Sequence, residues 1–479
     1  MNSKVAVNKM IAMTNTNQPP AGRPFGELPL PAAMLANLQQ LGYLTMTPIQ
    51  AASLPITLGG YDLIAQAKTG SGKTAAFGLP LLTKLNPRYF AVQAMVLCPT
   101  RELADQVAQE IRRLARAADN IKVVTLCGGS TMRPQMASLE HGAHIVVGTP
   151  GRIMDHLDRG TLNLESLNTL VLDEADRMLD MGFYDQIAYV ARHCPARRQT
   201  LLFSATYPDG VLRLARQFMH KPQEVKLEEQ HDDGKIRQRF YEVSREGRLQ
   251  AVAALLKHYR PVSTLAFCNT KQQCRDLLDV LQAQGIRALT LNGDLEQRER
   301  DQVLIQFANR SCSVLVATDV AARGLDIARL EAVINVDVTP DPEIHVHRIG
   351  RTGRADEDGW ALSLASPSEI HRVETIAKTM GFEPEWHQVN ELEGDDAPLV
   401  PPMVTLQILG GRKEKIRPGD VLGALTGDAG YTREQVGKIT VTDFSTYVAV
   451  ARNIANEAER KLSAGKVKGK TVKVRALEE

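Results

Sequence analysis

Two segments of the chain carry residues whose types and spacing suit nucleotide chemistry. The earlier segment, residues 67–74 (Ala-Lys-Thr-Gly-Ser-Gly-Lys-Thr), matches a phosphate-binding loop with alanine in place of its first glycine. Its small residues let successive backbone N–H groups turn toward phosphates. Lys73 is expected to reach the β- and γ-phosphates, and the Thr74 hydroxyl to bind Mg²⁺. The later segment, residues 171–176 (Val-Leu-Asp-Glu-Ala-Asp), places carboxylates directly after an apolar run. Together the two segments predict a Mg²⁺-dependent ATPase site.

These residues need a rigid frame, and the surrounding pattern predicts one. From about Phe25, short apolar runs alternate with longer amphipathic ones, and strands that are apolar throughout indicate a parallel sheet covered on both faces. The predicted strands of a first α/β domain lie at 63–65, 95–98, 123–126, 145–147, 169–172 and 200–203, with helices such as 102–115 between them. The predicted strands of a second α/β domain lie at 265–268, 288–291, 314–317, 333–336 and 361–364.

The end of the chain has a different pattern. Residues 404–409 predict a strand, 418–425 a helix, 438–441 and 446–451 two strands, 453–462 a helix and 471–475 a last strand. This βαββαβ order suits a small sheet of the RNA-recognition (RRM-like) type. The expected organisation is a flexible extension (1–24), a first domain that binds ATP (25–227), a linker (228–234), a second domain (235–389), an acidic linker (390–402) and an RNA-binding domain (403–479).

Composition favours a globular protein of the cytoplasm. Hydrophobic residues make up 43% of the chain, the mean hydropathy is −0.20, and no apolar stretch approaches the roughly 20 residues of a membrane span. The first 22 residues are polar and lack the apolar core of a secretory signal. The six cysteines form no CxxC pair and lie mostly in apolar runs, so buried reduced thiols are expected.

Charge is unevenly distributed along the chain. Residues 403–479 hold 14 Lys and Arg against 9 Asp and Glu, whereas the remainder holds 43 against 46. This asymmetry indicates either an anionic partner for the C-terminal part or a solvated basic face. The charge alone does not separate the two.

Polar clusters follow the predicted strands of both α/β domains. Ligands of open parallel sheets bind beyond the carboxyl ends of the strands, so these clusters are expected to gather at one edge of each sheet. The clusters of the first domain lie at 99–103, 128–129, 149–152, 173–176 and 204–206, and those of the second at 292–294, 318–326 and 347–354.

With these motifs in this order, the chain resembles the DEAD-box RNA helicases from Phe25 to about Glu369. The resemblance implies two RecA-like domains that close over ATP and RNA. It assigns nucleotide binding to Phe25, Gln50, Ala67, Lys68, Thr69, Gly70, Ser71, Gly72, Lys73, Thr74, Gly324 and Asp326. Within this set Gln50 would bond the adenine edge, Asp326 would bond the ribose, and Phe25 would stack on the base. An ordinary buried phenylalanine is the alternative for Phe25.

The same resemblance implies the catalytic and RNA-binding residues. Lys73, Asp173, Glu174, Arg351 and Arg354 would be catalytic. Asp173 would hold Mg²⁺ together with Thr74, Glu174 would position the attacking water, and the two arginines would act as arginine fingers. Nucleotide state would be coupled to closure by Asp176, Ser204, Thr206 and His347, and the RNA backbone bound by Arg101, Gly128, Gly129, Thr149, Gly151, Arg152, Gln297, Arg300 and Thr318. Asn292 departs from the family pattern, which has histidine before Gly-Asp.

The C-terminal part resembles the DbpA group of bacterial DEAD-box proteins through residues 417–427 and 465–470. That resemblance implies a domain that directs the helicase to a hairpin of 23S ribosomal RNA, in pre-50S particles, with the protein acting as a monomer. The expected phosphate contacts are Arg412, Lys413, Lys415, Arg417, Lys438, Lys466, Lys468 and Lys470. Tyr447 is the candidate for base stacking, with core packing as its alternative.

Three other functions remain open on the sequence. An RNA-dependent ATPase can act as a clamp or ribonucleoprotein remodeller with little unwinding. A scaffold without catalysis is disfavoured because the triphosphatase residues are present. A DNA helicase is disfavoured by the RNA-recognition-type tail and by the match around Gln50.

Overall fold

The computed structural model describes residues 22–67, 70–118, 120–207, 209–226, 236–322, 330–353, 358–394 and 397–477, and the statements below concern these residues. The chain divides into two compact units. The first contains the described residues up to 226, and the second contains those from 236 onward.

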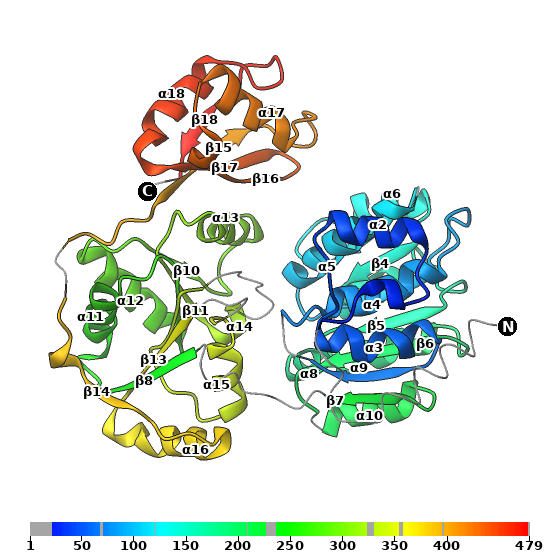
Figure 1. Cartoon of the computed structure of the whole chain (residues 1–479), viewed down its shortest axis with the longest axis horizontal. Helices are drawn as coiled ribbons and strands as arrows, with labels where there is room; N and C mark the ends of the chain where they lie inside the picture. The colour runs from blue at the N-terminus through cyan, green and yellow to red at the C-terminus, as the bar shows by residue number, and fades with distance from the viewer. Residues whose placement is uncertain are drawn as a thin grey trace. The chain divides into compact units, whose positions relative to one another are not determined.

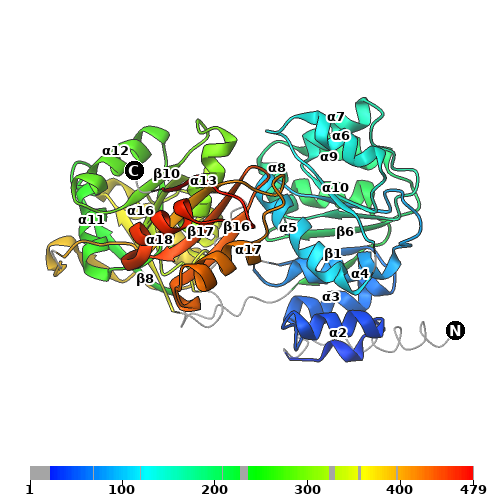
Figure 2. The same ribbon diagram turned by 90° about the horizontal axis from the view of Figure 1, so that it is seen from above.

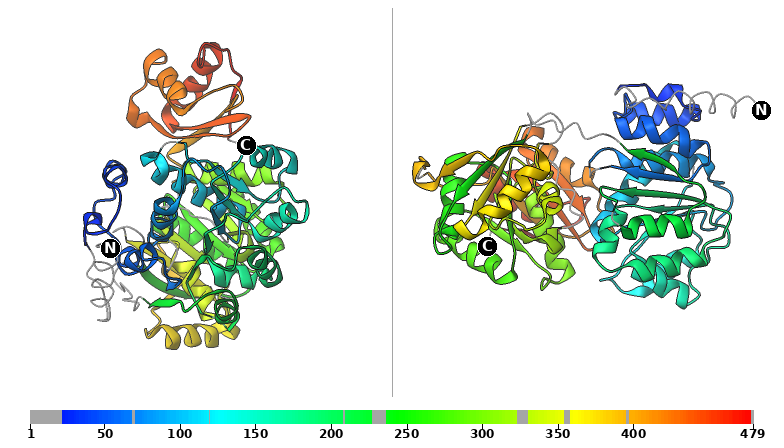
Figure 3. Two further views of the ribbon diagram at one scale, coloured as in Figure 1. Left: turned by 90° about the vertical axis from the view of Figure 1, so that its right-hand side faces the viewer. Right: turned by 90° about the horizontal axis from the view of Figure 1, so that it is seen from below.

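The first unit is built on a seven-stranded parallel sheet of order β3-β4-β2-β5-β6-β1-β7 (Figure 1). The strands are β1 (Leu63–Gln66), β2 (Ala94–Leu97), β3 (Val123–Leu126), β4 (Ile145–Gly148), β5 (Thr169–Leu172), β6 (Gln199–Ser204) and β7 (Gln223–Lys226). Helices cover both faces of the sheet, as Figures 2 and 3 show. Those of one face are α2 (Ala32–Gln40), α3 (Pro48–Leu58), α4 (Lys73–Lys84) and α5 (Arg101–Leu114). The others are α6 (Met132–Glu140), α7 (Pro150–Asp158), α8 (Ala175–Asp180), α9 (Tyr184–His193) and α10 (Asp209–Phe218).

The second unit contains another seven-stranded parallel sheet, of order β10-β11-β9-β12-β13-β8-β14. Its strands are β8 (Ile236–Glu242), β9 (Thr264–Cys268), β10 (Ala288–Leu291), β11 (Val314–Thr318), β12 (Ala332–Asn335), β13 (Gly359–Ala365) and β14 (Trp386–Gln388). Its helices are α11 (Arg248–Tyr259), α12 (Lys271–Ala283), α13 (Gln297–Ala308), α14 (Asp319–Ala322), α15 (Pro342–Ile349) and α16 (Ile370–Met380).

The C-terminal part of the second unit forms a four-stranded antiparallel sheet of order β16-β17-β15-β18. Its elements are β15 (Met403–Leu409), α17 (Pro418–Gly423), β16 (Val436–Val441), β17 (Ser445–Ala451), α18 (Ala455–Ala464) and β18 (Val474–Ala476). Val404, Leu406 and Ile408 face the core beneath α17 and α18, because alternate residues of a strand point to opposite faces. The predicted fold class, two RecA-like parallel sheets and a small βαββαβ domain, is confirmed.

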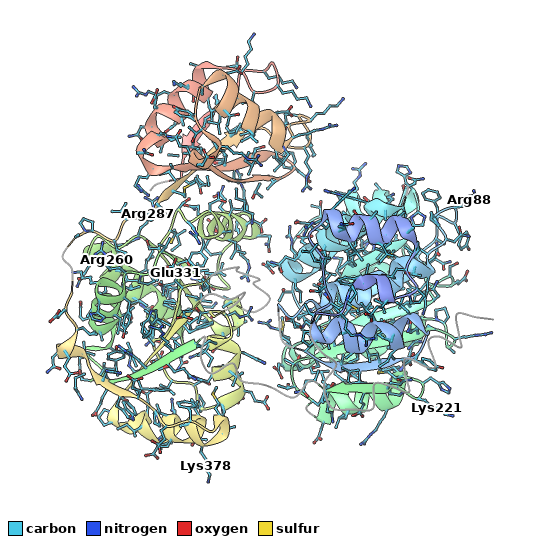
Figure 4. All side chains as sticks on the ribbon, in the orientation of Figure 1. Arg88, Lys221, Arg260, Arg287, Glu331 and Lys378 are labelled. Atoms are coloured by element: carbon cyan, nitrogen blue, oxygen red, sulfur yellow. The ribbon has the colours of Figure 1, made fainter. Side chains whose placement is uncertain are left out.

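The other face of the small sheet contacts the rest of the second unit through polar groups. The Thr405 hydroxyl on β15 bonds Asn309 Nδ2 at 3.1 Å and Ser311 Oγ at 2.6 Å. Arg287, labelled in Figure 4, donates to the carbonyl oxygen of Leu477 at 2.9 Å. Hydrogen bonds are directional, so these contacts favour one alignment of the small sheet on the residues that it contacts.

Three strands were not predicted, and their composition explains why. β7 reads Gln-Glu-Val-Lys, and it and β14 lie at the sheet edges, where water reaches the strand and polar residues are tolerated. β8, which is next to β14 in the sheet, has three consecutive polar residues, 237–239, before its buried Phe240 and Tyr241. All six cysteines lie in described residues, are buried and form no disulfide, as predicted. No described helix combines the length and apolarity that crossing a membrane requires.

A buried ion network supports the second parallel sheet. The Arg248 guanidinium at the start of α11 pairs with the carboxylates of Asp337 and Glu369, and its side chain is 6% exposed. Removing one partner of a buried pair leaves an uncompensated charge in a region that water does not reach.

We therefore expect Arg248→Met to lower the free energy of unfolding by about 3–5 kcal/mol. Arg237→Met is the matched control, because the Arg237–Asp358 pair has side chains 58% and 60% exposed and is worth less than about 1 kcal/mol. Urea unfolding followed by circular dichroism compares the two variants. Equal loss in both would contradict a structural role for the buried network.

Candidate nucleotide and RNA site

The phosphate-binding loop joins β1 to α4, and its backbone requires glycine. Gly70 and Gly72 have φ angles of 83° and 92°, in the left-handed region that glycine adopts without steric cost. A Cβ on Gly72 would lie 2.5 Å from Gln50 Nε2. Gln50 Nε2 donates to the Gly72 carbonyl at 3.0 Å, while its Oε1 accepts from Thr47 N at 2.9 Å. In this structure the amide predicted to bond adenine therefore bonds the loop.

Lys73 and Asp173 face each other in the interior of the first unit. Lys73 is the first residue of α4, Asp173 follows β5, and Lys73 Nζ lies 3.4 Å from Asp173 Oδ1. Neither atom makes a hydrogen bond of normal geometry to any described residue. Burial acts to lower the pKa of Lys73, but the carboxylates of Asp173, Glu174 and Asp176 outweigh it, so the pKa is raised. For Asp173, burial raises the pKa, and the positive charge of Lys73 offsets this rise only in part.

This pair fits a triphosphate with a divalent cation. A buried ammonium and a buried carboxylate, each short of hydrogen-bond partners, would be satisfied by phosphate oxygens and by a hydrated metal. The described residues contain no group of three or more His, Cys, Asp or Glu side chains able to hold a metal alone. Phosphates and water would then supply most ligands, which is the usual binding mode of Mg²⁺.

Glu174 has a backbone conformation that is costly for its residue type. Its φ and ψ are 52° and 55°, left-handed, at the junction between β5 and α8. For a residue other than glycine, this backbone conformation destabilises the folded state by roughly 1–3 kcal/mol. Glu174 follows Asp173 directly and is 5% exposed, and its carboxylate accepts from Arg177 Nη1 at 2.7 Å. Strain of this kind is common where a catalytic group must be held in one direction.

Asp176 links the ends of β5 and β6. Its Oδ2 accepts hydrogen bonds from Ala205 N at 3.1 Å, Thr206 N at 2.8 Å and Thr206 Oγ1 at 2.9 Å. Ser204 Oγ accepts from Asp176 N at 3.1 Å and donates to the Thr206 carbonyl at 2.7 Å. The structure thus brings the three predicted coupling residues of the first unit into one network.

Phe25 is 4% exposed and packs edge-on against Tyr43, with ring centroids 6.2 Å apart. The structure therefore places it in a small apolar core between α2, α3 and α4. This burial fits the core-packing alternative, and stacking of Phe25 on a base stays a prediction.

The predicted RNA-binding residues of the first unit lie in three segments at the carboxyl edge of the sheet, after β2, β3 and β4. Thr100 Oγ1 caps α5, which begins at Arg101, and Thr149 is the N-cap residue of α7, which contains Gly151 and Arg152. Gly128 and Gly129 follow β3, and Gly129 has a φ of 73°. One Arg101 nitrogen, Nη1, is buried without a hydrogen bond to any described residue.

Sequence reasoning missed the residue that joins these segments. The Gln135 amide on α6 donates to the Cys127 carbonyl and to Ser130 Oγ, both at 2.9 Å. Its Oε1 accepts from Arg152 Nη1 at 3.2 Å and from His156 Nε2 at 3.0 Å. Burial, followed by the Arg152 charge, lowers the pKa of His156, so this histidine is neutral at pH 7. A polar residue in the middle of a short helix carries no sequence signal for such a role.

In the second unit the predicted RNA-binding residues cluster near the ends of β10 and β11. Gln297 Nε2 donates to Asp301 Oδ1 at 2.7 Å, and Arg300 Nη2 donates to the Ala321 carbonyl at 2.7 Å. Thr318 ends β11. Asn292 is 6% exposed, and its Oδ1 accepts from Asp294 N at 2.9 Å, so it closes the turn after β10.

Arg348 is a second residue that the sequence did not single out. It is 2% exposed on α15 and makes two bonds of 2.7 Å to the Asp319 carboxylate. It also donates to the Asp337 carbonyl at 2.7 Å. This bidentate pair holds the start of α14 against α15, the helix that precedes Arg351. His347 is exposed on α15, and Arg351 is 7% exposed.

Five predicted residues lie outside the described residues: Lys68, Thr69, Gly324, Asp326 and Arg354. The same applies to the first linker, 228–234, and to most of the extension, 1–24.

The C-terminal basic residues are exposed: Arg412, Lys413, Lys415, Arg417, Lys438, Lys466, Lys468 and Lys470. Tyr447 is 4% exposed, and its hydroxyl lies 3.2 Å from Gln407 Nε2 and 3.3 Å from Gln302 Nε2. Gln302 belongs to α13, so a base could stack on Tyr447 only if this contact opened.

Comparison with known proteins agrees with this geometry. Residues 47–214 match the DEAD/DEAH box helicase family, 247–356 the helicase conserved C-terminal domain, and 405–476 the DbpA RNA binding domain. The chain is 53% identical over 448 residues to the ATP-dependent RNA helicase DbpA of Escherichia coli, covering 94% of this chain and 98% of that protein. It is 44% identical over 356 residues to the DEAD-box ATP-dependent RNA helicase CshA of Geobacillus kaustophilus, covering 74% and 76%.

Among solved structures, S. cerevisiae Dbp5 bound to RNA and ADP BeF3 aligns with a TM-score of 0.71 at 31% identity, covering 77% of this chain and 96% of that chain. With the paired triphosphatase segments, two parallel sheets and three matching families on one chain, the protein belongs to the DEAD-box ATP-dependent RNA helicases that carry a DbpA RNA-binding domain.

Proposed function

We propose that this ATP-dependent RNA helicase opens short RNA duplexes locally and that its C-terminal domain directs it to a hairpin of 23S ribosomal RNA during 50S assembly. The observation that carries the targeting is the DbpA RNA-binding domain at 405–476. The exposed basic residues of that domain support RNA binding as such, because phosphate contacts supply affinity without reading sequence. Pre-50S particles are the expected partners, and a cytoplasmic monomer is the expected form.

For catalysis we propose that the buried pair of the first unit binds the nucleotide. Lys73 would bind the β- and γ-phosphates, and Asp173 with Thr74 would hold Mg²⁺, which supplies charge neutralisation at the phosphates. Glu174 would orient the attacking water. The support for this role is its strained backbone, directly after Asp173 in the chain, together with the burial of its side chain.

RNA would control the rate because the catalytic groups are divided between two units. Lys73 of the first unit would supply one cationic group at the transferring phosphoryl, and Arg351 and Arg354 of the second would supply the others. An arginine finger is worth about 10³–10⁵ in rate. RNA that binds both units would favour the closed state by its higher affinity for that state.

Glu174→Gln is expected to bind ATP about as tightly as the natural protein and to hydrolyse it at least about 100-fold more slowly, because the amide cannot accept the water's proton. Titration of a fluorescent ATP analogue and RNA-stimulated turnover measure the two quantities. Glu140→Gln is the matched control, since that carboxylate is exposed at the end of α6. Turnover near the natural rate in Glu174→Gln would remove the assigned role.

Gln135→Ala is expected to raise the RNA concentration for half-maximal ATPase stimulation about fivefold to tenfold, because two or more hydrogen bonds that hold the RNA-facing segments are lost. The KM for ATP should not change. Gln39→Ala, at an exposed position of α2, is the control. A shift in the KM for ATP with no change for RNA would show that the network serves the nucleotide instead.

Removal of residues 403–479 is expected to leave RNA-stimulated ATPase activity but to abolish its preference for 23S ribosomal RNA. The truncation also uncovers Asn309 and Ser311, so a full-length chain with Lys466, Lys468 and Lys470 changed to glutamine should be compared with it. Stimulation by ribosomal RNA, an unrelated RNA and a DNA of the same sequence is measured for each. Equal stimulation by every RNA in the natural protein would contradict the targeting.

Strand displacement with and without ATP separates the helicase from the alternative, a clamp or ribonucleoprotein remodeller. The proposal expects displacement of short duplexes that requires ATP. Tight ATP-dependent binding without displacement would favour the clamp.

A further inference from the structure

Two loops of the C-terminal domain are joined at one end of its sheet. One loop, residues 410–416, follows β15, and the other, residues 442–444, connects β16 to β17. Arg412 N donates to the Thr442 carbonyl at 2.9 Å, and Lys413 N donates to the Asp443 carbonyl at 3.1 Å. A Cβ on Gly411 would lie 2.3 Å from the Thr442 oxygen, so the approach requires glycine at that position. The joined loops form a preorganised surface.

The shorter loop is itself rigid. Thr442 N donates to the Ser445 carbonyl at 2.8 Å, and Thr442 Oγ1 donates to the same oxygen at 2.8 Å. Ser445 is 5% exposed, whereas Phe444 beside it is 64% exposed. The turn therefore presents the Phe444 ring to solvent, and the geometry of the turn, not disorder, determines its direction.

Phe444 has one cationic group over its ring and further basic residues on the same loops. Lys413 Nζ lies 4.0 Å from the centroid of the Phe444 ring, and Arg412 Nη1 lies 3.6 Å from the Asp443 carboxylate. Lys468 on a neighbouring loop donates to the Lys415 carbonyl. Of the three aromatic residues in 403–477, only Phe444 is exposed, because Tyr431 and Tyr447 are 8% and 4% exposed.

Single exposed apolar side chains are common and need no explanation by themselves. Phe444 differs because its loop is hydrogen-bonded to a second loop, and because Lys413 lies over one face of its ring. Aromatic rings interleaved with basic residues bind single-stranded nucleic acid, in which bases stack on the ring and cations contact the backbone.

We propose that Phe444 stacks on an unpaired base of a structured RNA while Lys413 and Arg412 contact the phosphates beside that base. Because Lys413 lies over one face, the base takes the open face. An unpaired base is required, since the faces of paired bases inside a helix are covered by their neighbours. The inference rests on the proposed RNA targeting and gives that surface its aromatic contact, in place of the buried Tyr447.

The test uses full-length protein and fluorescein-labelled fragments of 23S ribosomal RNA, each carrying one hairpin. The hairpin with the tightest binding is compared with a blunt duplex of its stem. Phe444→Ala is expected to weaken hairpin binding about 10- to 100-fold, the loss of one stacked base, and to leave duplex binding unchanged. Phe444→Trp should retain the natural affinity. Phe90→Ala is the matched control, because that ring is 46% exposed in the first unit.

A spectroscopic measurement distinguishes stacking from a general effect on folding. With 2-aminopurine at one loop position of the hairpin, the natural protein and Phe444→Trp should change its fluorescence, and Phe444→Ala should not. If the natural protein does not prefer the hairpin to its stem duplex, the proposed targeting fails, and this inference fails with it. If the preference exists but Phe444→Ala retains both affinity and fluorescence change, the targeting stands and the stacking role is overturned.

Discussion

The buried pair of Lys73 and Asp173 is the interaction on which the rest of this molecule depends. Both charges are buried, and removing an ion from water costs several kcal/mol of free energy. The two atoms lie 3.4 Å apart, so neither makes a normal hydrogen bond to a described residue. A pair in this condition contributes little stability. We propose that a bound ligand satisfies both charges, and a triphosphate with a divalent cation has the matching chemistry.

The surrounding fold holds this pair in place at some cost. Gly72 needs a left-handed φ so that Gln50 can bond the loop, and Glu174 takes the same kind of conformation without glycine's freedom. The network of Asp176, Ser204 and Thr206 joins the ends of β5 and β6 directly beside the pair. A shift in the nucleotide site would therefore be felt at the sheet edge, where the residues proposed to bind RNA begin.

Much of the fold could be predicted from the sequence because central parallel strands are apolar on both faces. The run at 169–172, for example, is completely buried as β5. Edge strands such as β7 were missed, since water reaches them and their residues are polar. The first linker and several loop residues, Asp326 and Arg354 among them, lie outside the described residues and stay predictions.

The candidate site residues that could be predicted from the sequence lie in motifs, and those that were missed hold the motif residues through hydrogen bonds. Gln135 and Arg348 act through hydrogen bonds to residues distant in sequence, and single side chains of these types carry no local pattern. Tyr447 could not be placed from the sequence, because strand alternation fixes its face but not what covers that face; Gln302 of α13 lies over it. Phe444 was overlooked because only the packing of two loops shows that its ring is exposed.

The most direct test of this account is the Mg²⁺ dependence of ATP binding in Asp173→Asn, with RNA absent. The account predicts that Mg²⁺ strengthens ATP binding to the natural protein and that this gain is lost in the variant, while ATP binding without Mg²⁺ is retained through Lys73. An undiminished Mg²⁺ effect in Asp173→Asn would contradict the assignment of the buried carboxylate, and with it the claim that the pair exists to bind a metal-bound triphosphate.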